Sequence, residues 1–526
     1  MAALSEGKNK SNGFMSGVLV LSLSAVIVKI IGLIYKIPML RLLGSEGMGY
    51  FNSAYEIYTL FCTVATTGLP VAMAVMISSS GDKCISKGQK VFSVAVKLFL
   101  LLGTLGSLIM VVFAKPFAAF VGGEGTLGCV FAIAPTVFLV CMSSAYKGYF
   151  QGLGKMSPTA VSQMIEAVGK LALGLLFAFL ALNSGAKTET VAAFAVFGLT
   201  LGNAASLLYL VSARYLGVKE KQIEIDDASD KKLAAELLKT AIPITLSSAV
   251  ISLTKVIDMT VILKRLQGMG VSSADAFAAY GNYTTLALPL FGLAPALISA
   301  VALPLVPALS RAVAENDGEG QKKAIGDAIG LTLLLAMPIS VGLTMFSQPI
   351  LNLIFQGEPR AISESAPLLA LLGPSVSLAC MITVSNAILQ AYGAPSVPIL
   401  SMAIGSLVKI LLAYMLIGIE PIGLAGAPIS TFVCDLIINV VNFAFIGKYI
   451  DSIPDFCGML LRPFLMSALA VSVARLFYNM SAESVFCSTT ATVIAILIAG
   501  VVYCISAILM GELKRYGMKI KLVNNH

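Results

Sequence analysis

The stretch from Ser16 to Gly49, SGVLVLSLSAVIVKIIGLIYKIPMLRLLGSEGMG, contains the features on which the interpretation of the chain depends. Its first two-thirds are apolar and long enough to cross a bilayer, which needs about 20 helical residues. Lys29 lies near the middle of this apolar run, and Lys36 follows close to two helical turns later, so both ammonium groups share one helix face. A lysine at bilayer depth costs about 2.5 to 3.5 kcal/mol on insertion scales and usually faces a bundle interior or a hydrated cavity. We therefore interpret this helix as one wall of a pathway for an anionic molecule.

The composition indicates an all-α polytopic membrane protein. Of the 526 residues, 58% are hydrophobic and 12% are charged, and the mean hydropathy is +0.92. Soluble globular proteins carry about 25% charged residues. Fourteen apolar spans are expected, at 17–40, 50–77, 91–114, 127–146, 158–182, 190–212, 241–263, 277–306, 327–354, 366–390, 398–419, 422–446, 463–480 and 485–510.

The sequence lacks the patterns of common metal-dependent and ATP-dependent enzymes. His526 is the only histidine, which excludes HExxH zinc sites and Ser-His-Asp triads. The nine cysteines are scattered without a CxxC pair. Gly154-Lys155 does not complete a Walker A loop, because Tyr149 stands where the first glycine is needed. We expect no enzyme activity, no metal and no cofactor.

Loop charges predict the orientation in the membrane. Alternate loops, counted from the N-terminus, hold 22 Lys and Arg residues, and the other loops hold six. Under the positive-inside rule, both termini are expected in the cytoplasm, with the chain in the cell membrane. The net charge of +8 is then mostly a topological signal, and no nucleic-acid partner is needed to explain it.

Two halves of the chain are similar in sequence. A shift of 224 residues aligns Ser24-Ala25-Val26 with Ser248-Ala249-Val250, and a shift of 239 aligns Lys170 with Lys409. The halves have the same direction, so the repeat is parallel, with its axis along the membrane normal. We expect two pseudo-symmetric six-helix lobes plus two extra C-terminal helices. The expected divisions are a lobe at 1–216, a cytoplasmic linker at 217–239, a second lobe at 240–450, and helices 13 and 14 with a cytoplasmic tail at 451–526.

Basic residues inside the first span form the first part of the candidate binding site. Lys29 has no carboxylate within its own helix, although Glu56 on the second span is within its expected reach. Lys36 lies near the outer end of the span, where its side chain can also extend to the interface. Arg41 closes the segment and completes this part of the site.

Three further lysines occupy central positions in spans 5, 7 and 11, and these spans belong to corresponding parts of the two halves: Lys170, Lys255 and Lys409. The structural alternative is charge pairing within a helix, since Glu166 lies four residues before Lys170 and Asp258 three residues after Lys255. No carboxylate is close to Lys409 in the sequence. Two other basic residues, Lys97 and Arg475, lie near span ends and are expected to extend to the interface.

These buried ammonium groups suit a phosphate. A lysine is a compact point charge that fits a moving anion, whereas arginine favours a fixed bidentate contact. A lipid diphosphate that crosses the bilayer needs its charge offset at midplane depth. If Asp258 is not paired with Lys255, it is a candidate for a coupling Na⁺ or H⁺; membrane potential is the other expected driving force.

The sequence resembles the multidrug/oligosaccharidyl-lipid/polysaccharide exporter superfamily, most closely the polysaccharide-biosynthesis branch with stage V sporulation protein B and the MurJ-like lipid II flippases. The resemblance is carried by residues in both halves: Lys29-Ile-Ile-Gly32, Arg41 through Gly49, Ala54 through Tyr58, Thr67 through Ala72, Leu303 through Ser310, and Leu389-Gln390. It implies two lobes around a cavity of alternating access, and a groove for the lipid tail shaped by spans 13 and 14. Lipid II flippases carry cavity arginines on the first helix; one such position matches Lys29, and the second falls at Tyr35, beside Lys36.

We expect a monomeric flippase for an undecaprenyl-diphosphate-linked cell-wall precursor, with lipid II as the leading substrate and a vegetative or sporulation role left open. Its expected partners are the lipid-linked anionic sugar and membrane lipids. Three alternatives remain. Another lipid-linked oligosaccharide is compatible with the same fold. A cation-coupled multidrug exporter favours acidic cavity residues, opposite in sign to the lysines, and a membrane enzyme lacks support from any motif.

Overall fold

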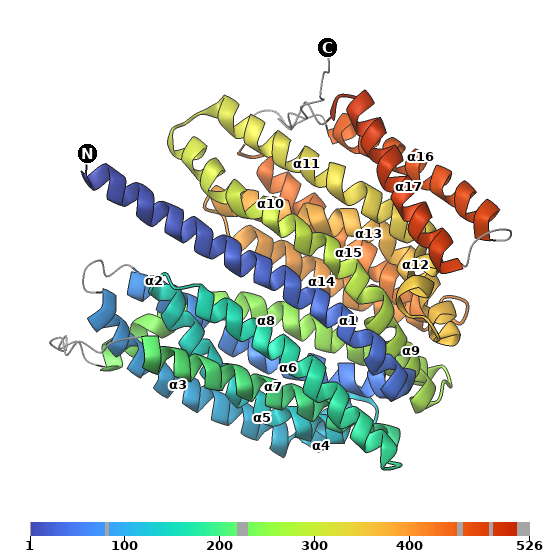
Figure 1. The fold of residues 1–526 in the computed structure, drawn as a ribbon, viewed down its shortest axis with the longest axis horizontal. Helices are drawn as coiled ribbons and strands as arrows, with labels where there is room; N and C mark the ends of the chain where they lie inside the picture. The colour runs from blue at the N-terminus through green and yellow to red at the C-terminus, as the bar shows by residue number, and fades with distance from the viewer. Residues whose placement is uncertain (1, 79–83, 218–229, 450–455, 483–487, 513–526) are drawn as a thin grey trace. The chain divides into compact units, whose positions relative to one another are not determined.

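The computed structural model describes residues 2–78, 84–217, 230–449, 456–482 and 488–512, and within these ranges the chain is helical, with no strand (Figure 1). This confirms the expected all-α fold. A helix satisfies all of its backbone hydrogen bonds within one segment, which a bilayer requires. The elements are α1 Ala2–Thr66, α2 Gly68–Ser78, α3 Cys84–Val112, α4 Ala114–Val121, α5 Thr126–Gly152, α6 Ser157–Asn183, α7 Thr188–Gly217, α8 Asp230–Gly268, α9 Ser273–Asn282, the π-helix η2 Tyr283–Ala287, α10 Leu288–Ala314, α11 Gly318–Met345, α12 Ser347–Ile354, α13 Pro359–Ala391, α14 Ser396–Ile417, the 3₁₀-helix η3 Gly423–Ala425, α15 Gly426–Ile446, α16 Phe456–Ala482 and α17 Ser488–Leu509.

Twelve helical segments of the described chain are long and apolar enough to span a membrane. The first of them, Val26–Ser78, covers 26–40 of the first expected span and all of the second, and Gly44 interrupts it with a φ of 67°. This left-handed conformation favours glycine, so the local sequence places the break between the two spans. The expected span at 277–306 coincides with α9, η2 and α10, and each of the other expected spans coincides with one of the remaining segments.

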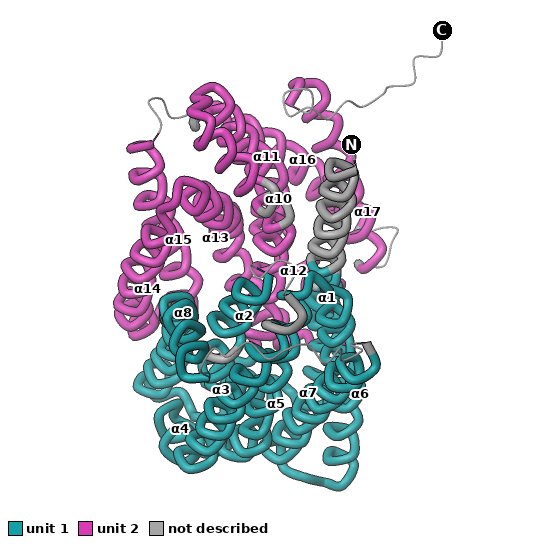
Figure 2. The backbone as a smooth tube through the Cα atoms, turned by 90° about the vertical axis from the view of Figure 1, so that its left-hand side faces the viewer, with its two compact units in different colours: residues 1–281 teal, residues 282–526 magenta. Residues whose placement is uncertain are grey.

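The described residues divide into two compact units, Met1–Gly281 and Asn282–His526 (Figure 2). Helix α8, which the sequence assigns to the second lobe, packs in this structure against α1 and α2 of the first unit. The hydroxyls of Thr63 and Ser252 lie 2.6 Å apart across this contact. The lobe boundaries expected from the sequence stay a prediction, and 218–229 of the expected linker and the tail at 513–526 lie outside the described residues.

Both units contain the same local pattern of helices. In each, a long helix is followed by an eight-residue helix and then by another long helix: α3, α4 and α5 in the first unit, α11, α12 and α13 in the second. The short helices α4 and α12 each carry proline at their third position, Pro116 and Pro349. This shared order agrees with the internal repeat.

Glycines allow α6 and α7 to approach closely in the first unit. A Cβ added to Gly169 would lie 2.7 Å from Gly202 Cα, and one added to Gly198 would meet the backbone of Gly174. A Cβ at Gly202 would lie 2.8 Å from the backbone nitrogen of Lys170. Small residues permit such crossings in membranes. This crossing therefore fixes the part of α6 that carries Lys170.

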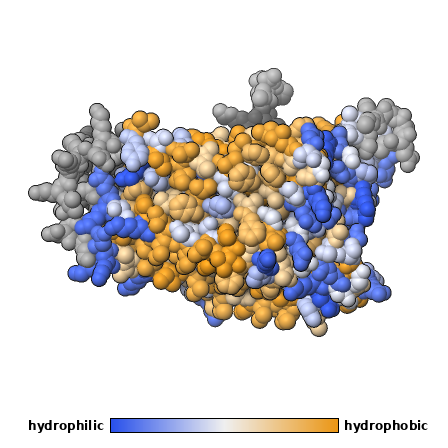
Figure 3. Space-filling model, turned by 90° about the horizontal axis from the view of Figure 1, so that it is seen from below, coloured by the Kyte–Doolittle hydropathy of each residue, from blue (hydrophilic) through white to orange (hydrophobic). Residues whose placement is uncertain are grey.

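The surface has the pattern of a multi-pass membrane protein. The face in Figure 3 is apolar across its middle, and hydrophilic side chains gather at both ends. Large apolar residues are exposed on several helices, among them Leu101 on α3 and Leu208 on α7, at 62% and 67% exposure. Soluble monomers rarely leave such extensive apolar surface uncovered.

Candidate functional site

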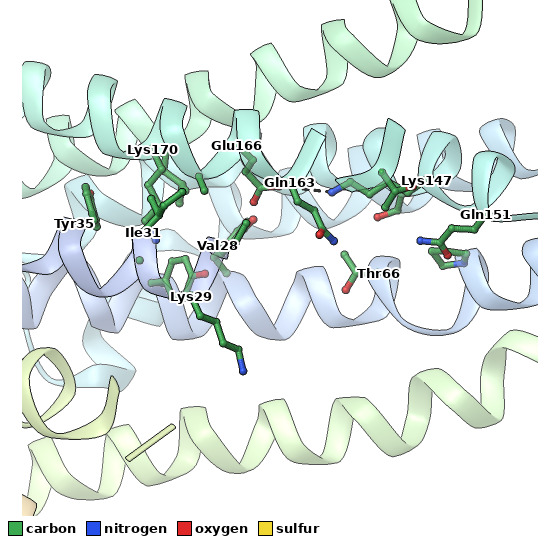
Figure 4. A pocket seen from close by; sticks show the side chains of 18 of the residues that line it. Val28, Lys29, Ile31, Tyr35, Thr66, Lys147, Gln151, Gln163, Glu166 and Lys170 are labelled. Carbon is green, nitrogen blue, oxygen red and sulfur yellow. Dashed lines mark ion pairs between the residues drawn. The ribbon is translucent and has the colours of Figure 1, made fainter. Parts of the chain in front are cut away.

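A cavity of about 580 Å³, with several charged and polar side chains in an otherwise apolar wall, lies inside the first unit (Figure 4). Helices α1, α2, α5 and α6 form most of its wall, and α7 adds Leu199. Its charged and polar lining consists of Lys29, Lys147, Lys170, Glu166, Gln151, Gln163, Tyr35, Tyr55, Tyr58, Thr66, Ser144 and Thr159.

Helical spacing brings the polar side chains of α5 and α6 to one place. On α6, Gln163 lies three residues before Glu166, and Glu166 lies four residues before Lys170. At these spacings the three side chains share one face of the helix. Lys147 and Gln151 are four residues apart on α5 and share another. In Figure 4 the side chain of Lys147 points toward that of Glu166, whereas Lys170 extends toward α1. The spacing of residues along two helices thus places a group of polar side chains in the wall of one cavity.

Glu166 forms an ion pair with Lys147. Lys147 Nζ lies 3.6 Å from Glu166 Oε2, and the two side chains are 19% and 32% exposed, so the pair is mostly buried (Figure 4). The sequence suggested instead a pair of Glu166 with Lys170, one helical turn away. The structure shows a different pairing: the charges of Glu166 and Lys170 influence each other, but the close contact of Glu166 is with Lys147 on the neighbouring helix.

The ammonium of Lys170 lies over three aromatic rings. Its Nζ is 4.6 Å from the ring centroid of Tyr55, 5.3 Å from that of Tyr35 and 5.8 Å from that of Phe51. A cation over a ring face gains about 0.5 to 2 kcal/mol, the larger value when water is excluded. The rings stabilise the charge without using a carboxylate. The half-buried ammonium therefore keeps its hydrogen-bond donors available for an anion.

The cavity carries net positive charge. Three lysines and one glutamate line it, which gives a formal charge of +2. Coulomb interactions are much stronger here than in bulk water, because the effective dielectric constant inside a protein is low. The cavity thus favours an anionic guest.

Lys29 and Lys36 differ in their relation to this cavity. Lys29 lines it but is exposed, and its ammonium points away from the side chains of α6 (Figure 4). Lys36 is half-buried and does not belong to the lining residues, although the charges of Lys170 and Glu56 both act on it. Of the expected binding residues, the cavity therefore brings together Lys29 and Lys170.

The other expected residues lie outside this lining. Arg41 on α1 and Lys255 on α8 are exposed, and Asp258 on α8 is half-buried. Lys409 is half-buried on α14 in the second unit. Their roles in binding or coupling stay predictions.

Sequence reasoning missed several residues that matter to the geometry. Lys147 is one of the 22 Lys and Arg residues counted above as loop charges, but α5 continues to Gly152 and carries it into the cavity wall. The spacing of Gln163, Glu166 and Lys170 was the signal that could have found the polar face. For Lys409, the carboxylate that the sequence did not indicate is Asp435 on α15, which the Lys409 charge influences.

Comparison with known proteins identifies the family. Residues 14–313, more than half of the chain, match the model of a family described as "Polysaccharide biosynthesis protein". The chain belongs to this family. A second model, described as "MatE", matches residues 243–415.

Individual relatives agree with this membership. The chain is 25% identical over 446 residues to "Stage V sporulation protein B" of Bacillus subtilis, covering 83% of this chain and 84% of the relative. It is 26% identical over 429 residues to "Lipid II flippase MurJ" of Bacillus subtilis, covering 77% and 78%. Among solved structures, "Lipid II flippase MurJ, inward closed conformation" matches with a TM-score of 0.72 at 17% identity, covering 94% of this chain and 99% of that one. The chain is thus a MurJ-like member of the multidrug/oligosaccharidyl-lipid/polysaccharide exporter superfamily, a membrane translocator and not an enzyme.

Proposed function

We propose that this protein is a flippase that moves an undecaprenyl-diphosphate-linked cell-wall precursor, lipid II in the first place, across the cytoplasmic membrane. Family membership supports a flippase or exporter in general. The observation that carries the narrower proposal is the cavity of net charge +2 in the first unit, with the Lys170 ammonium supported by three aromatic rings.

The proposal follows from the charge of the cargo. A diphosphate diester brings about two negative charges to a depth where water is scarce. The cavity offers Lys170, whose ammonium has no carboxylate within 4.0 Å among the described residues, and Lys147, whose partner Glu166 is 3.6 Å away. Lysines follow a moving anion better than arginines do, because an ammonium has no fixed planar geometry. The amides of Gln151 and Gln163 add hydrogen-bonding groups for phosphate or sugar.

The transport cycle that we propose is alternating access without ATP, driven by membrane potential or by a Na⁺ or H⁺ gradient. Asp258 is the candidate coupling residue. We place both termini in the cytoplasm, on the basis of the 22 to six asymmetry of loop charges. We expect the protein to act as a monomer with the lipid-linked sugar and membrane lipids as its partners.

A second candidate cargo is another lipid-linked oligosaccharide. The identities to stage V sporulation protein B and to MurJ are nearly the same, at 25% and 26%, so sequence similarity does not favour one over the other. A cationic drug is a poorer candidate despite the MatE match, because the cavity repels positive charge.

Reconstituted vesicles test the proposal directly. The full-length protein is incorporated with fluorescent lipid II, and the fraction of label that becomes accessible on the opposite side is followed over time. We expect translocation by the wild type and by Lys97→Gln, a control whose side chain is 68% exposed and pairs with Asp230. We expect loss with Lys170→Gln. Equal translocation by wild type and Lys170→Gln would contradict the role of the cavity. If the protein translocated a different lipid-linked sugar and not lipid II, that sugar would replace lipid II as the proposed cargo.

A further inference from the structure

Glu166 is the only acidic residue among the described residues that line the cavity of the first unit. Along the cavity it lies between Lys170 and Lys147 (Figure 4). Its Oε2 is 3.6 Å from Lys147 Nζ on α5, and Lys170 follows one helical turn later on α6. The Glu166 charge also acts on Lys170. The cavity therefore contains a negative charge of its own, placed among the ammonium groups that favour an anionic guest.

The ion pair of Lys147 and Glu166 is a loose one. At 3.6 Å, the nitrogen and the oxygen are farther apart than in a hydrogen bond, which has a distance of about 2.7 to 3.2 Å. Neither side chain forms a hydrogen bond with another residue that the structure describes, and both are partly exposed to the cavity. Partly exposed ion pairs contribute little to stability. An anion that enters the cavity can therefore separate these two groups.

Other contacts hold the two helices that carry this pair. Helix α6 packs mainly against α1 and α7, and α5 packs mainly against α3 and α7, whereas α5 and α6 have few contacts with each other. A Cβ added to Gly148 on α5 would lie 2.9 Å from Pro70 Cα, so α5 is packed closely against α2. The crossing at Gly169 and Gly202 holds α6 against α7 in the same way. The two charges can therefore separate by side-chain motion alone.

A binding site inside a translocator has two opposing requirements. Binding must be favourable enough for the cargo to enter and weak enough for it to leave. The three cavity lysines attract an anion strongly, because charges interact more strongly inside a protein than in water. When the anion leaves, each lysine that it had paired with loses a counter-charge, which is unfavourable inside a protein. A carboxylate beside the lysines reduces both effects, because it lowers the cavity charge from +3 to +2 and pairs with an ammonium after the anion has left.

We propose that Glu166 exchanges with the diphosphate of the cargo at Lys147 and thereby speeds the release of the cargo. In the empty cavity, Glu166 pairs with Lys147. An entering diphosphate binds the Lys147 ammonium in place of Glu166, whose charge then repels the bound anion at close range. When the diphosphate departs, Glu166 pairs with Lys147 again. This inference rests on the proposed function, because it requires an anionic cargo in the cavity, and it adds the residue that sets the rate of release.

Affinity and transport rate should respond to Glu166 in opposite directions. Glu166→Gln should bind lipid II several-fold more tightly and release it several-fold more slowly, since affinity differences between related complexes lie mainly in the dissociation rate. Its translocation rate at saturating lipid II should fall by a similar factor. Lys147→Gln breaks the same ion pair but leaves the Glu166 charge unpaired beside the guest, so it should bind lipid II several-fold less tightly. A pair with only a structural role would give the same change in affinity with both variants.

A chase experiment with the purified full-length protein measures release directly. The protein is loaded with fluorescent lipid II, an excess of unlabelled lipid II is added, and the loss of bound fluorescence gives the dissociation rate. The same variants are reconstituted in vesicles, where translocation is measured at saturating lipid II. Glu166→Asp keeps the charge and should release lipid II nearly as fast as the wild type. Glu124→Gln is the matched control, because it removes the same charge at an exposed position outside the cavity, and it should behave as the wild type does.

The outcomes separate this inference from the proposed function. Slower release and slower translocation by Glu166→Gln, with a normal rate in Glu166→Asp, would support the exchange. An unchanged or faster dissociation rate in Glu166→Gln would overturn it while leaving lipid II as the cargo. Weaker binding by both Glu166→Gln and Lys147→Gln, together with lower unfolding temperatures, would also overturn it and would assign the pair a structural role. Failure of the wild type itself to bind and translocate lipid II would refute both the proposed function and this inference.

Discussion

Replacing Lys170 with glutamine removes the positive charge that lies over Tyr35, Phe51 and Tyr55 and leaves a slightly shorter, polar side chain. The formal charge of the cavity falls from +2 to +1. A hydrogen bond from a charged donor contributes about 1.5 to 3 kcal/mol, and 1.4 kcal/mol corresponds to a factor of ten, so the loss of one such bond to a phosphate lowers affinity about 10- to 100-fold. We expect translocation of lipid II in vesicles to fall by a comparable factor at limiting substrate.

The unfolding temperature of the variant distinguishes a binding role of Lys170 from a structural one. Burial of an ammonium is costly, and the rings offset only part of that cost. Lys170→Gln should therefore unfold at the same temperature as the wild type or higher, as measured by a thermal shift of the purified protein. If the variant transported lipid II within twofold of the wild type, the reasoning would be refuted. Joint loss of transport and thermal stability would instead show that Lys170 holds the helices together.

Three further variants address the neighbouring parts of the structure. Glu166→Gln breaks the 3.6 Å pair with Lys147 and raises the cavity charge to +3, so lipid II should bind several-fold more tightly in a titration; weaker binding would show that the pair organises the site. Gly198→Leu places a side chain against the backbone of Gly174 and should cost about 1 to 3 kcal/mol, seen as a lower unfolding temperature, whereas an unchanged temperature would contradict the close helix crossing. Lys29→Gln should abolish complementation of a strain depleted of its lipid II flippase at unchanged protein level, and normal growth would remove Lys29 from the transport pathway.

Much of the fold could be predicted from the sequence because the bilayer restricts the alternatives. Apolar length alone located the spans, since each must cover the hydrocarbon core with one helix. Gly44 lies between the first two expected spans, and its positive φ explains why the helix breaks there. The assignment of α8 to one unit or the other was not available from the sequence, because it depends on packing between helices that are far apart along the chain, as at Thr63 and Ser252.

The site was only partly predictable, for a related reason. A charge inside a span predicts a functional position, and Lys170 and Lys29, which were selected on this basis, both line the cavity. The ion-pair partner of a charged residue depends on which helices pack together. Glu166 pairs with Lys147 of α5 and not with the lysine on its own helix. The aromatic rings around Lys170 come from α1, more than a hundred residues earlier in the sequence. Spacing within one helix carries no information about such contacts.

Photocrosslinking from inside the cavity tests most directly whether an anionic lipid enters it. The photoreactive residue p-benzoylphenylalanine is introduced in place of Thr66, which lines the cavity and is exposed, and in a control in place of Leu101, which is 62% exposed on α3. Vesicles containing lipid II and excess phosphatidylcholine are irradiated, and the adducts are identified by mass spectrometry. We predict a lipid II adduct at position 66 that is lost with Lys170→Gln, and only phosphatidylcholine adducts at position 101. The absence of a lipid II adduct at position 66 would contradict the account. So would an adduct at position 66 that persists unchanged with Lys170→Gln.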